Sequence, residues 1–554
     1  FNNFIDWTRR QYERSLIFLN RFRAVVVLLF ILSLGLTGWL YTQVPTAFIP
    51  EEDQGYFITI IQGPEGVSLN YTSKVMRQVE EEILKLPEVV GTFAVGGFGF
   101  SGSTANNGVI FTTLKPWEER HEPDQSVQGI LKNLGGKLST ITEARVLPVN
   151  PPAIQGLGNF GGFQFQLQDR RGNSGLDTMV QVMGQLLGRG NQTPGLQAVF
   201  STFSANTPQL LIEVDRNKAK ALQVDIDDIF NTLQSYLGSR YVNDFNYLQR
   251  TYRVYVQADT QFRSNPQDIG RLYVRSRNNQ TNNQANSQGN SQMVPLSNLV
   301  KIIPSTGAQT INHYNLFRSI EINGSAPPGT SSGEAIQAME QVAKQVLPAG
   351  YGYEWSGISA EEQASGGQAP LIFALGLIFV FLVLAAQYEN YIDPLIIMLS
   401  VPLAILGALS AQSLRGLAND VYCQVGLVML IGLASKNAIL IVEFANQLRE
   451  QGRSITKAAI EASEQRLRPI LMTTFAFVLG VWPLLFPEGA GAASRKSLGT
   501  AIVGGTLVST FLSLIVVPIL YIVIAKIRDR LLRRRKSPQL QPVEDGRVPT
   551  EIHK

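Results

Sequence analysis

Lys436 is the residue whose position most directly demands a chemical role, because it lies inside an apolar run from residue 421 to residue 445. A charge at the centre of a membrane helix costs roughly 2.5–3.5 kcal/mol on insertion scales. Glu443 is the only acid that we find in the apolar runs, and it lies about 10 Å away along a helix axis. We therefore expect Lys436 to lose its proton or to pair with an acid on another helix. The simpler alternative is that Lys436 snorkels or binds backbone carbonyls.

Six apolar runs are each close to the ~20 residues that a membrane-spanning helix needs. They cover residues 24–41, 369–385, 394–414, 421–445, 470–486 and 497–525. The polar stretch between the first two runs, residues 42–368, predicts a large water-soluble domain. The composition of the 554 residues, 45% hydrophobic and 16% charged, is thus an average over two unlike parts.

Lys and Arg gather at one side of these spans, in residues 1–23, 449–468 and 526–554. Such clusters mark the cytoplasmic side of a membrane, so both termini are expected in the cytoplasm and residues 42–368 outside it. The net charge of +4 is then a topology signal, and no nucleic-acid partner is expected. The chain begins with Phe1 rather than methionine, which leads us to expect a piece of a longer protein.

The exterior domain repeats one order of elements. Alternating and helical patterns predict strand, helix, two strands, helix and strand over residues 56–149, which is the split βαβ arrangement. A second copy begins at residue 163 and resumes at residue 318 after a long insertion. Within the insertion, residues 276–292 are almost entirely Asn, Gln and Ser. We interpret them as a disordered hairpin tip, with a partner-docking element as the alternative.

Five short sequences carry a resemblance to a known family. They are FIPEEDQG at 48–55, FAVGGFGF at 93–100, YVNDF at 241–245, GLASKNA at 432–438 and RLRPILMT at 466–473. With the order of spans and repeats, they resemble the C-terminal half of a resistance-nodulation-division (RND) multidrug efflux transporter of the hydrophobe/amphiphile exporter branch. The resemblance extends from about residue 1 to residue 526.

The resemblance implies an α-helical membrane protein with an α+β periplasmic domain. Six transmembrane helices, residues 24–41 and five within 369–525, would carry two split βαβ (ferredoxin-like) porter units and an inserted docking subdomain. The periplasmic domain, 42–368, would divide into porter unit one (46–160), porter unit two (161–215 and 293–360) and the docking subdomain (216–292). An amphipathic segment, 1–23, and a basic tail, 526–554, would be cytoplasmic.

The same resemblance implies a secondary active transporter of the bacterial inner membrane rather than an enzyme. It would be a trimer that exchanges protons for hydrophobic or amphiphilic compounds from the periplasm and the outer leaflet. It would pass them to a periplasmic adaptor and an outer-membrane channel. The implied proton relay uses Lys436, Arg466 and Thr473, together with a pair of Asp on a helix of the N-terminal half. Taken alone, Arg466 could be a cytoplasmic topology charge and Thr473 a packing hydroxyl.

Aromatic residues of the exterior domain are candidates for contact with substrate. Large rings on strands or in a Gly-rich loop offer apolar area without directional hydrogen bonds, which suits varied amphiphiles. The alternative for ring positions on strands is ordinary core. The candidate set is Phe93, Phe98, Phe100, Phe111, Phe163 and Phe165, with Ile58, Ile60 and Gln62 on the first strand.

No cofactor or metal is predicted. The strands that carry the candidate set contain no Met, Cys or His, the ligands that a metal exporter would need. No nucleotide-binding loop or nucleophile triad is present in the sequence. Two functions remain: half of a proton/drug antiporter, or a non-transporting remnant or scaffold that lacks the relay acids. The presence of Lys436, Arg466, Thr473 and the phenylalanine loop favours the antiporter.

Overall fold

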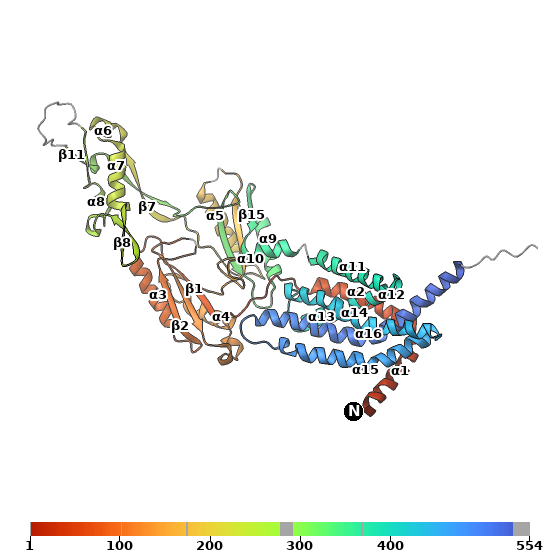
Figure 1. The fold of residues 1–554 in the computed structure, drawn as a ribbon. Helices are drawn as coiled ribbons and strands as arrows, with labels where there is room; N and C mark the ends of the chain where they lie inside the picture. Colours follow the sequence, from red (N-terminus) through yellow and green to blue (C-terminus); the bar gives the residue numbers. More distant parts are fainter. Residues whose placement is uncertain (1, 101, 173–174, 278–291, 367–368, 536–554) are drawn as a thin grey trace, which may run out of the picture. The chain divides into compact units, whose positions relative to one another are not determined.

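A computed structural model describes residues 2–100, 102–172, 175–277, 292–366 and 369–535 (Figure 1). The chain forms two compact units. The first contains residues 1–63, 69–202 and 312–554, and the second contains residues 64–68 and 203–311. Most of the polar tip predicted at residues 276–292 lies outside the described residues.

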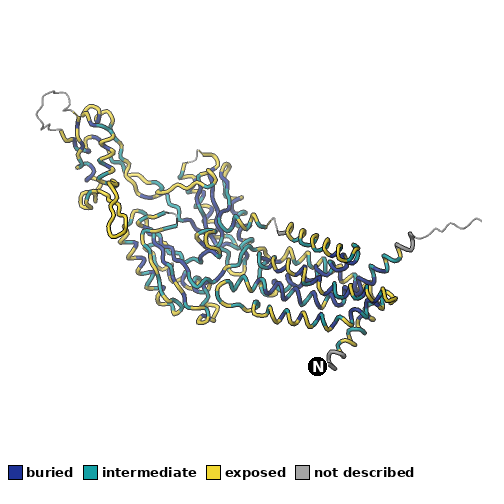
Figure 2. Tube along the Cα trace, in the orientation of Figure 1, coloured by how far each residue is buried: buried dark blue, intermediate teal, exposed yellow. Residues whose placement is uncertain are grey.

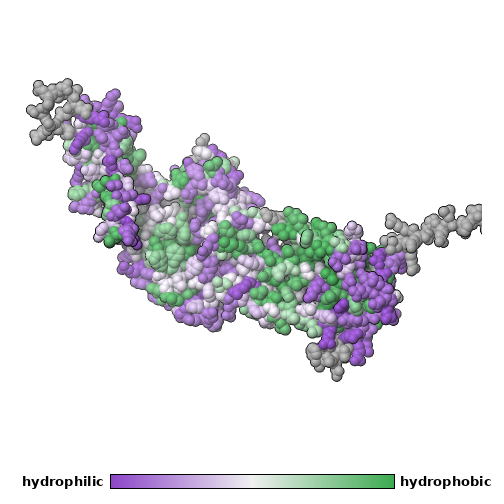
Figure 3. Space-filling view, in the orientation of Figure 1, coloured by the Kyte–Doolittle hydropathy of each residue, from purple (hydrophilic) through white to green (hydrophobic). Residues whose placement is uncertain are grey.

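Helices long and apolar enough to cross a membrane number six among the residues described. They confirm the six predicted apolar runs, and Figure 3 shows hydrophobic residues gathered over this part of the first unit. The third of them consists of two successive helices. The bounds are α1 Asn2–Arg21, α2 Arg23–Gln43, α11 Ala369–Tyr388, α12 Ile392–Met398, α13 Val401–Leu414, α14 Val421–Glu450, α15 Ile455–Val481 and α16 Ala492–Arg535.

Helix α16 packs closely against α13 because small residues line the contact. A Cβ atom added to Gly504 would lie 2.3 Å from the Cβ of Ala411, and one added to Gly407 would lie 2.6 Å from the carbonyl oxygen of Gly504. Small residues allow helix backbones to approach without a hydrophobic driving force in the bilayer. Figure 2 shows many buried residues along α13, α14 and α16, and α16 packs against both other helices, so α16 is a central helix of the bundle.

The first sheet of the first unit has the order β2-β3-β1-β4, and every pairing in it is antiparallel. Helices α3 and α4 pack on it through apolar residues at helical spacing, such as Val75, Val79 and Ile83 of α3, all at most 2% exposed. The bounds are β1 Tyr56–Gln62, α3 Leu69–Ile83, β2 Val89–Gly96, β3 Asn107–Leu114, α4 Val127–Leu138 and β4 Arg145–Val149.

The second sheet has the order β13-β14-β5-β15, with β6 paired to β14. Strand β5 is central and is buried on both faces along its whole length. Helix α10 leads from this sheet toward α11. The bounds are β5 Phe163–Asp169, α5 Leu176–Gly190, β6 Gln197–Phe200, β13 Asn312–Tyr314, β14 Phe317–Ser325, α9 Ser332–Val346, β15 Tyr351–Trp355 and α10 Gly357–Gly366.

The second compact unit contains the long insertion and extends beyond residues 216–292 on both sides. Its own core includes Ala219, Ile229 and Leu296, each fully buried. Every residue of the hairpin β8–β9 is exposed, and Figure 2 shows it in yellow. The bounds are β7 Thr207–Val214, α6 Arg216–Ala221, α7 Ile226–Leu233, β8 Arg240–Tyr247, β9 Arg250–Val256, α8 Pro266–Ile269, β10 Tyr273–Arg275, β11 Met293–Pro295 and β12 Val300–Gly307.

Candidate functional site

Lys436 lies on the outward face of α14. It is exposed, and in the part of the chain that the structure describes it has no hydrogen bond or ion pair. Val425, Met429, Gly432 and Glu443 recur at helical spacing along the same exposed face. The ammonium thus projects from the middle of a membrane-length helix, away from the core of the bundle.

The residue that follows Lys436 faces the other way. The Asn437 amide is 5% exposed and its Nδ2 donates to Oγ1 of Thr510 on α16 over 3.0 Å. The Thr510 hydroxyl lies 3.2 Å from Oγ1 of Thr474 on α15. This polar triad joins the three longest helices of the bundle. Sequence reasoning missed Asn437 and Thr510, although Asn437 stands beside Lys436 within the quoted GLASKNA sequence.

Thr473, like Lys436, is exposed. Its hydroxyl donates to the carbonyl of Ile470, 3.1 Å away in its own helix, which is the ordinary arrangement for a threonine in an apolar helix. The guanidinium of Arg466 lies 4.6 Å from the ring centroid of Phe444 on α14, in cation–π geometry. The Nε atom of Arg466 is buried without a hydrogen-bond partner in the described residues. Among the described residues, no hydrogen bond or ion pair joins any two of the three predicted relay residues.

The spans of the structure extend beyond the predicted apolar runs and contain acids besides Glu443, of which Asp393 is buried. The third span begins at Ile392, two residues ahead of the predicted run, and so includes Asp393. Asp393 is 5% exposed. Its carboxylate accepts hydrogen bonds from Nδ2 of Asn390 (2.6 Å) and from Nδ2 of Asn446 (3.0 Å). Asn446 is ten residues beyond Lys436, about 15 Å along the helix. Asp393 is thus satisfied by amides far from the lysine.

The glycine-rich loop and its neighbours form one cluster of rings. Phe98 and Phe100 meet edge to face with centroids 5.8 Å apart, and Phe100 meets Phe160 at 5.0 Å. Phe160 lies 5.9 Å from Phe200, and Ile60 packs with both. Gly97 takes φ +78°, which a side chain would oppose, so the loop reaches this cluster through a turn that favours glycine. Phe160 and Phe200 were not foreseen, because Phe160 lies in the irregular segment before β5 and Phe200 lies on β6, both outside the glycine-rich loop.

The other candidate rings lie in two separate places. Phe163 and Phe165 are 4% and 0% exposed and contact Trp355 edge to face, at 6.0 and 5.3 Å, in the core of the second sheet. Phe93 is 68% exposed and lies 6.4 Å from Phe111 on the neighbouring strand.

The first strand supplies the remaining candidates. Ile58 is 5% exposed, and Nε2 of Gln62 donates to the carbonyl of Thr202 over 3.2 Å. The pairing of Ile58 with Phe111, and of Phe111 with Phe93, places these residues on one face of the first sheet, together with Ile60 and Gln62, whereas Phe163 and Phe165 lie in the second sheet.

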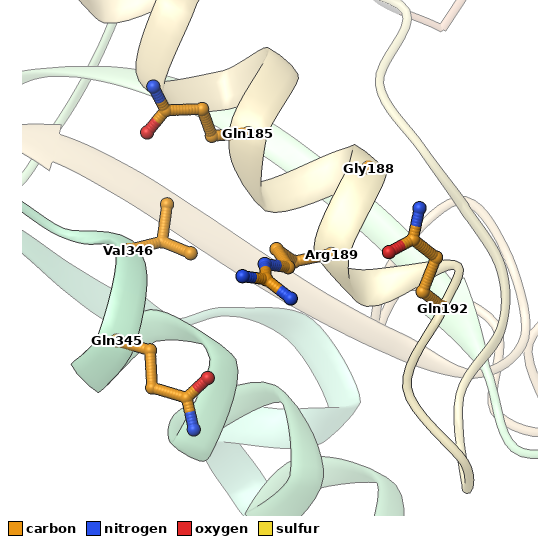
Figure 4. Close-up of a pocket in the computed structure, with 6 residues that line it drawn as sticks. All are labelled: Gln185, Gly188, Arg189, Gln192, Gln345 and Val346. Atoms are coloured by element: carbon orange, nitrogen blue, oxygen red, sulfur yellow. The ribbon is translucent and has the colours of Figure 1, made fainter.

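Cavities lined by described residues of the first unit include two of similar volume. One, of about 440 Å³, lies between α5 and α9 (Figure 4). Its polar lining contains no predicted site residue: Gln185, Gly188, Arg189, Gln192, Gln345 and Val346. The hydrogen-bonding amides and the guanidinium make it a poor match for a hydrophobic compound.

The second cavity, of about 430 Å³, is bordered by residues 47–52, by Phe163 and by Glu362 of α10. Burial raises the pKa of the Glu362 carboxyl to about 7, although a hydrogen bond from the Ser332 hydroxyl, 2.8 Å away, opposes the shift. Phe163 is the one member of the predicted pocket set among its lining residues.

The described helices and sheets define a polytopic membrane protein with a large α+β part outside the spans. Residues 1–525 match the AcrB/AcrD/AcrF family, and the chain belongs to this family of RND multidrug efflux transporters, as the sequence resemblance predicted.

Individual relatives agree with this assignment. The chain is 42% identical over 529 residues to the multidrug/solvent efflux pump membrane transporter MepB of Pseudomonas putida, covering 95% of this chain and 49% of the relative. It is 43% identical to the multidrug export protein AcrF of Escherichia coli K12, covering 88% of this chain and 46% of AcrF. It is 41% identical to the multidrug resistance protein MdtF of the same strain, covering 95% and 50%. The chain thus spans about half the length of these curated relatives.

Proposed function

We propose that this chain is the lysine-bearing C-terminal half of a proton-driven exporter of hydrophobic or amphiphilic compounds. The observation that carries the proposal is the outward position of Lys436, in mid-span and without a carboxylate among the described residues. A charge facing hydrocarbon is unfavourable by several kcal/mol, roughly 2.5–3.5 on insertion scales, so this face of α14 is built to meet another protein surface. The relatives are about twice as long as this chain, which leaves room for a second half to supply that surface.

In this proposal the second half brings the acids that Lys436 lacks. A carboxylate that binds either the ammonium or a proton has two states, and protonation releases the lysine. Each proton that crosses supplies about 2.3 kcal/mol per 100 mV of membrane potential, in addition to the pH gradient. Thr473 is exposed, as Lys436 is, and Arg466 lies against α14, the helix that carries Lys436. These positions suit a relay that a second protein half completes.

The substrate-facing part of the proposal rests on the Phe98–Phe100 cluster. Phe98 is 39% exposed, and Phe100 connects it to the buried ring of Phe160. The loop therefore exposes an aromatic ring that is supported by packed rings. Inner-membrane location with cytoplasmic termini, a trimer of complete transporters, a periplasmic adaptor and an outer-membrane channel belong to the same proposal, supported by family membership.

The test is Lys436→Met in the complete transporter that contains this chain. We expect proton-dependent efflux of ethidium and Nile red from cells to fall to the level of cells without the transporter, because the relay loses its cation. Lys457→Met is the matched control, since it removes the same charge from an exposed position near the start of α15, and it should retain efflux. Efflux retained by Lys436→Met at equal abundance would overturn the relay, and a wild-type chain without efflux would favour a remnant or scaffold.

A further inference from the structure

Residues 45–53 form a strap that connects α2 to strand β1 and is bonded to the entrance of α14. The amide of Asn419 donates to the carbonyl of Pro45 over 2.8 Å, and the amide of Val421, the first residue of α14, donates to the carbonyl of Phe48 over 3.0 Å. Thr46 and Asn419 form a parallel β-bridge. The strap therefore follows the end of the helix that carries Lys436.

Glu52 ties the strap to a second helix. Its carboxylate accepts from the amides of Ala493 (3.1 Å) and Ser494 (2.9 Å) and from the hydroxyl of Ser494 (2.6 Å). These are the second and third residues of α16, and Glu52 is 8% exposed. An ionised carboxylate at a helix N-terminus satisfies amides that have no partner within the helix and interacts favourably with the helix dipole. Charge-assisted bonds of this kind are about twice as strong as neutral ones.

Asp53, the next residue, ties the strap to Arg120 and to helix α4, which packs on the first sheet. Nη1 and Nη2 of Arg120 donate to its two oxygens over 2.8 and 3.1 Å, and the amide of Val127 at the start of α4 donates over 3.1 Å. Partial burial opposes ionisation, but the hydrogen bonds from Arg120, Gly55 and Val127 lower the pKa of Asp53 below its ordinary value. Two successive carboxylates thus hold α16 on one side and the sheet on the other.

Helix α16 also reaches the polar triad beside Lys436. Thr510, which binds Asn437, lies 16 residues beyond Ser494, about 24 Å along the helix. Near the strap, the hydroxyl of Ser497 donates to Asp420 over 2.7 Å, and Asp420 accepts from the amide of Cys423 in α14. Helices α14 and α16, two of the three helices that the triad joins, are therefore joined again at the end that meets the strap.

We propose that Glu52 is a positioning residue that transmits displacement of α16 to the first sheet, and so couples proton passage to substrate movement. The inference rests on the proposed function. A rigid helix held at one end by Glu52 and bonded in mid-span to the neighbour of Lys436 gives the relay a direct mechanical connection to β1.

The test uses the complete transporter reconstituted in liposomes under an imposed pH gradient, with proton flux read by internal pyranine and transport read with ethidium and Nile red. In Glu52→Gln the amide group replaces one acceptor oxygen and the charge is lost. We expect dye transport per proton to fall about tenfold, the range of a hydrogen bond to a charged group, while proton flux persists. Glu51→Gln is the matched control, because this neighbour undergoes the same substitution and has no hydrogen bond or ion pair in the described residues, and its dye transport per proton should match wild type.

The outcomes separate the two proposals. Unchanged dye transport per proton in Glu52→Gln overturns the strap inference alone, and so does an equal loss of both fluxes with an unchanged melting temperature. If Glu52→Gln does not fold, Ser494→Ala decides, because it removes only the 2.6 Å hydroxyl bond and leaves the two amides; its ratio should fall about threefold, and an unchanged ratio overturns the inference. A wild-type protein without pH-driven transport contradicts the proposed function itself.

Discussion

Lys436 and Asn437 are adjacent in the chain and have opposite surroundings. The inward amide of Asn437 is 5% exposed and bonded to Thr510, which also lies within hydrogen-bond distance of Thr474. The outward ammonium of Lys436 has no bonded partner in the residues described. Thr474 and Thr473 repeat the contrast on α15, where the inward hydroxyl meets Thr510 and the outward one meets only its own helix.

The difference separates polar groups that find hydrogen-bond partners on other helices of this chain from polar groups that do not. Buried polar groups are nearly always hydrogen-bonded, and the triad of Asn437, Thr510 and Thr474 obeys this rule with residues of this chain. On the outward side, the Lys436 ammonium has no hydrogen bond or ion pair in the described residues, and the Thr473 hydroxyl donates only to a carbonyl of its own helix. The inward triad is therefore a structural connection within the chain, and the outward residues are the half of a site that we propose another half completes.

A buried and a partly exposed phenylalanine of the exterior domain show the same contrast, and the largest predicted change in the free energy of unfolding is at the buried one. Phe165→Ala should lower the free energy of unfolding by about 3–5 kcal/mol, because it leaves a cavity beside Trp355 and Tyr353. Phe98→Ala should cost less than about 1 kcal/mol and instead change which dyes are exported, since its ring is partly exposed. Chemical denaturation with efflux assays measures both. Equal destabilisation by the two variants would contradict the division into core and surface rings.

Asn437 and Lys436 of α14 should differ in their effect on stability, by less than the two phenylalanines do. Asn437→Ala should destabilise this chain by about 1–3 kcal/mol, because the Thr510 hydroxyl loses its amide donor in a buried place. Lys436→Met should leave the stability of the chain unchanged or higher, since a charge is removed from an apolar face. Thermal melting in detergent of the chain without its companion half compares the two. A larger drop in melting temperature in Lys436→Met than in Asn437→Ala would contradict the assignment of Asn437 as the structural residue of the two.

Periodicity predicted the long elements well, because apolar runs and alternating strands report burial directly. Strand β1, residues 56–62, begins and ends where the alternation predicts. Asp393 was missed because the apolar pattern was started at Pro394, whereas the helix begins at Ile392 and nearby amides donate hydrogen bonds to the carboxylate. Asn437 and Thr510 were missed because a small polar residue in an apolar helix carries no sign of which way it faces.

The rings of β5 show a further limit of the sequence. Alternation places Phe163, Phe165 and Leu167 on one face of the strand and the intervening glutamines on the other. Gln164, Gln166 and Gln168 on that face are nonetheless buried, since α10 and the neighbouring strands cover it and Ser356 and Glu321 bond Gln166. Whether a phenylalanine on β5 meets solvent or core is decided by these later segments, which no local pattern contains.

The central claim is that the counter-charge of Lys436 lies outside this sequence, and a zero-length cross-link tests it most directly. A membrane-permeant carbodiimide joins a lysine amine to a carboxylate in direct contact, and mass spectrometry of the complete transporter identifies the joined peptides. The account predicts an amide bond between Lys436 and an acid absent from these 554 residues, with no such product in Lys436→Met. A bond from Lys436 to Glu443 or Asp393 of this chain would contradict it.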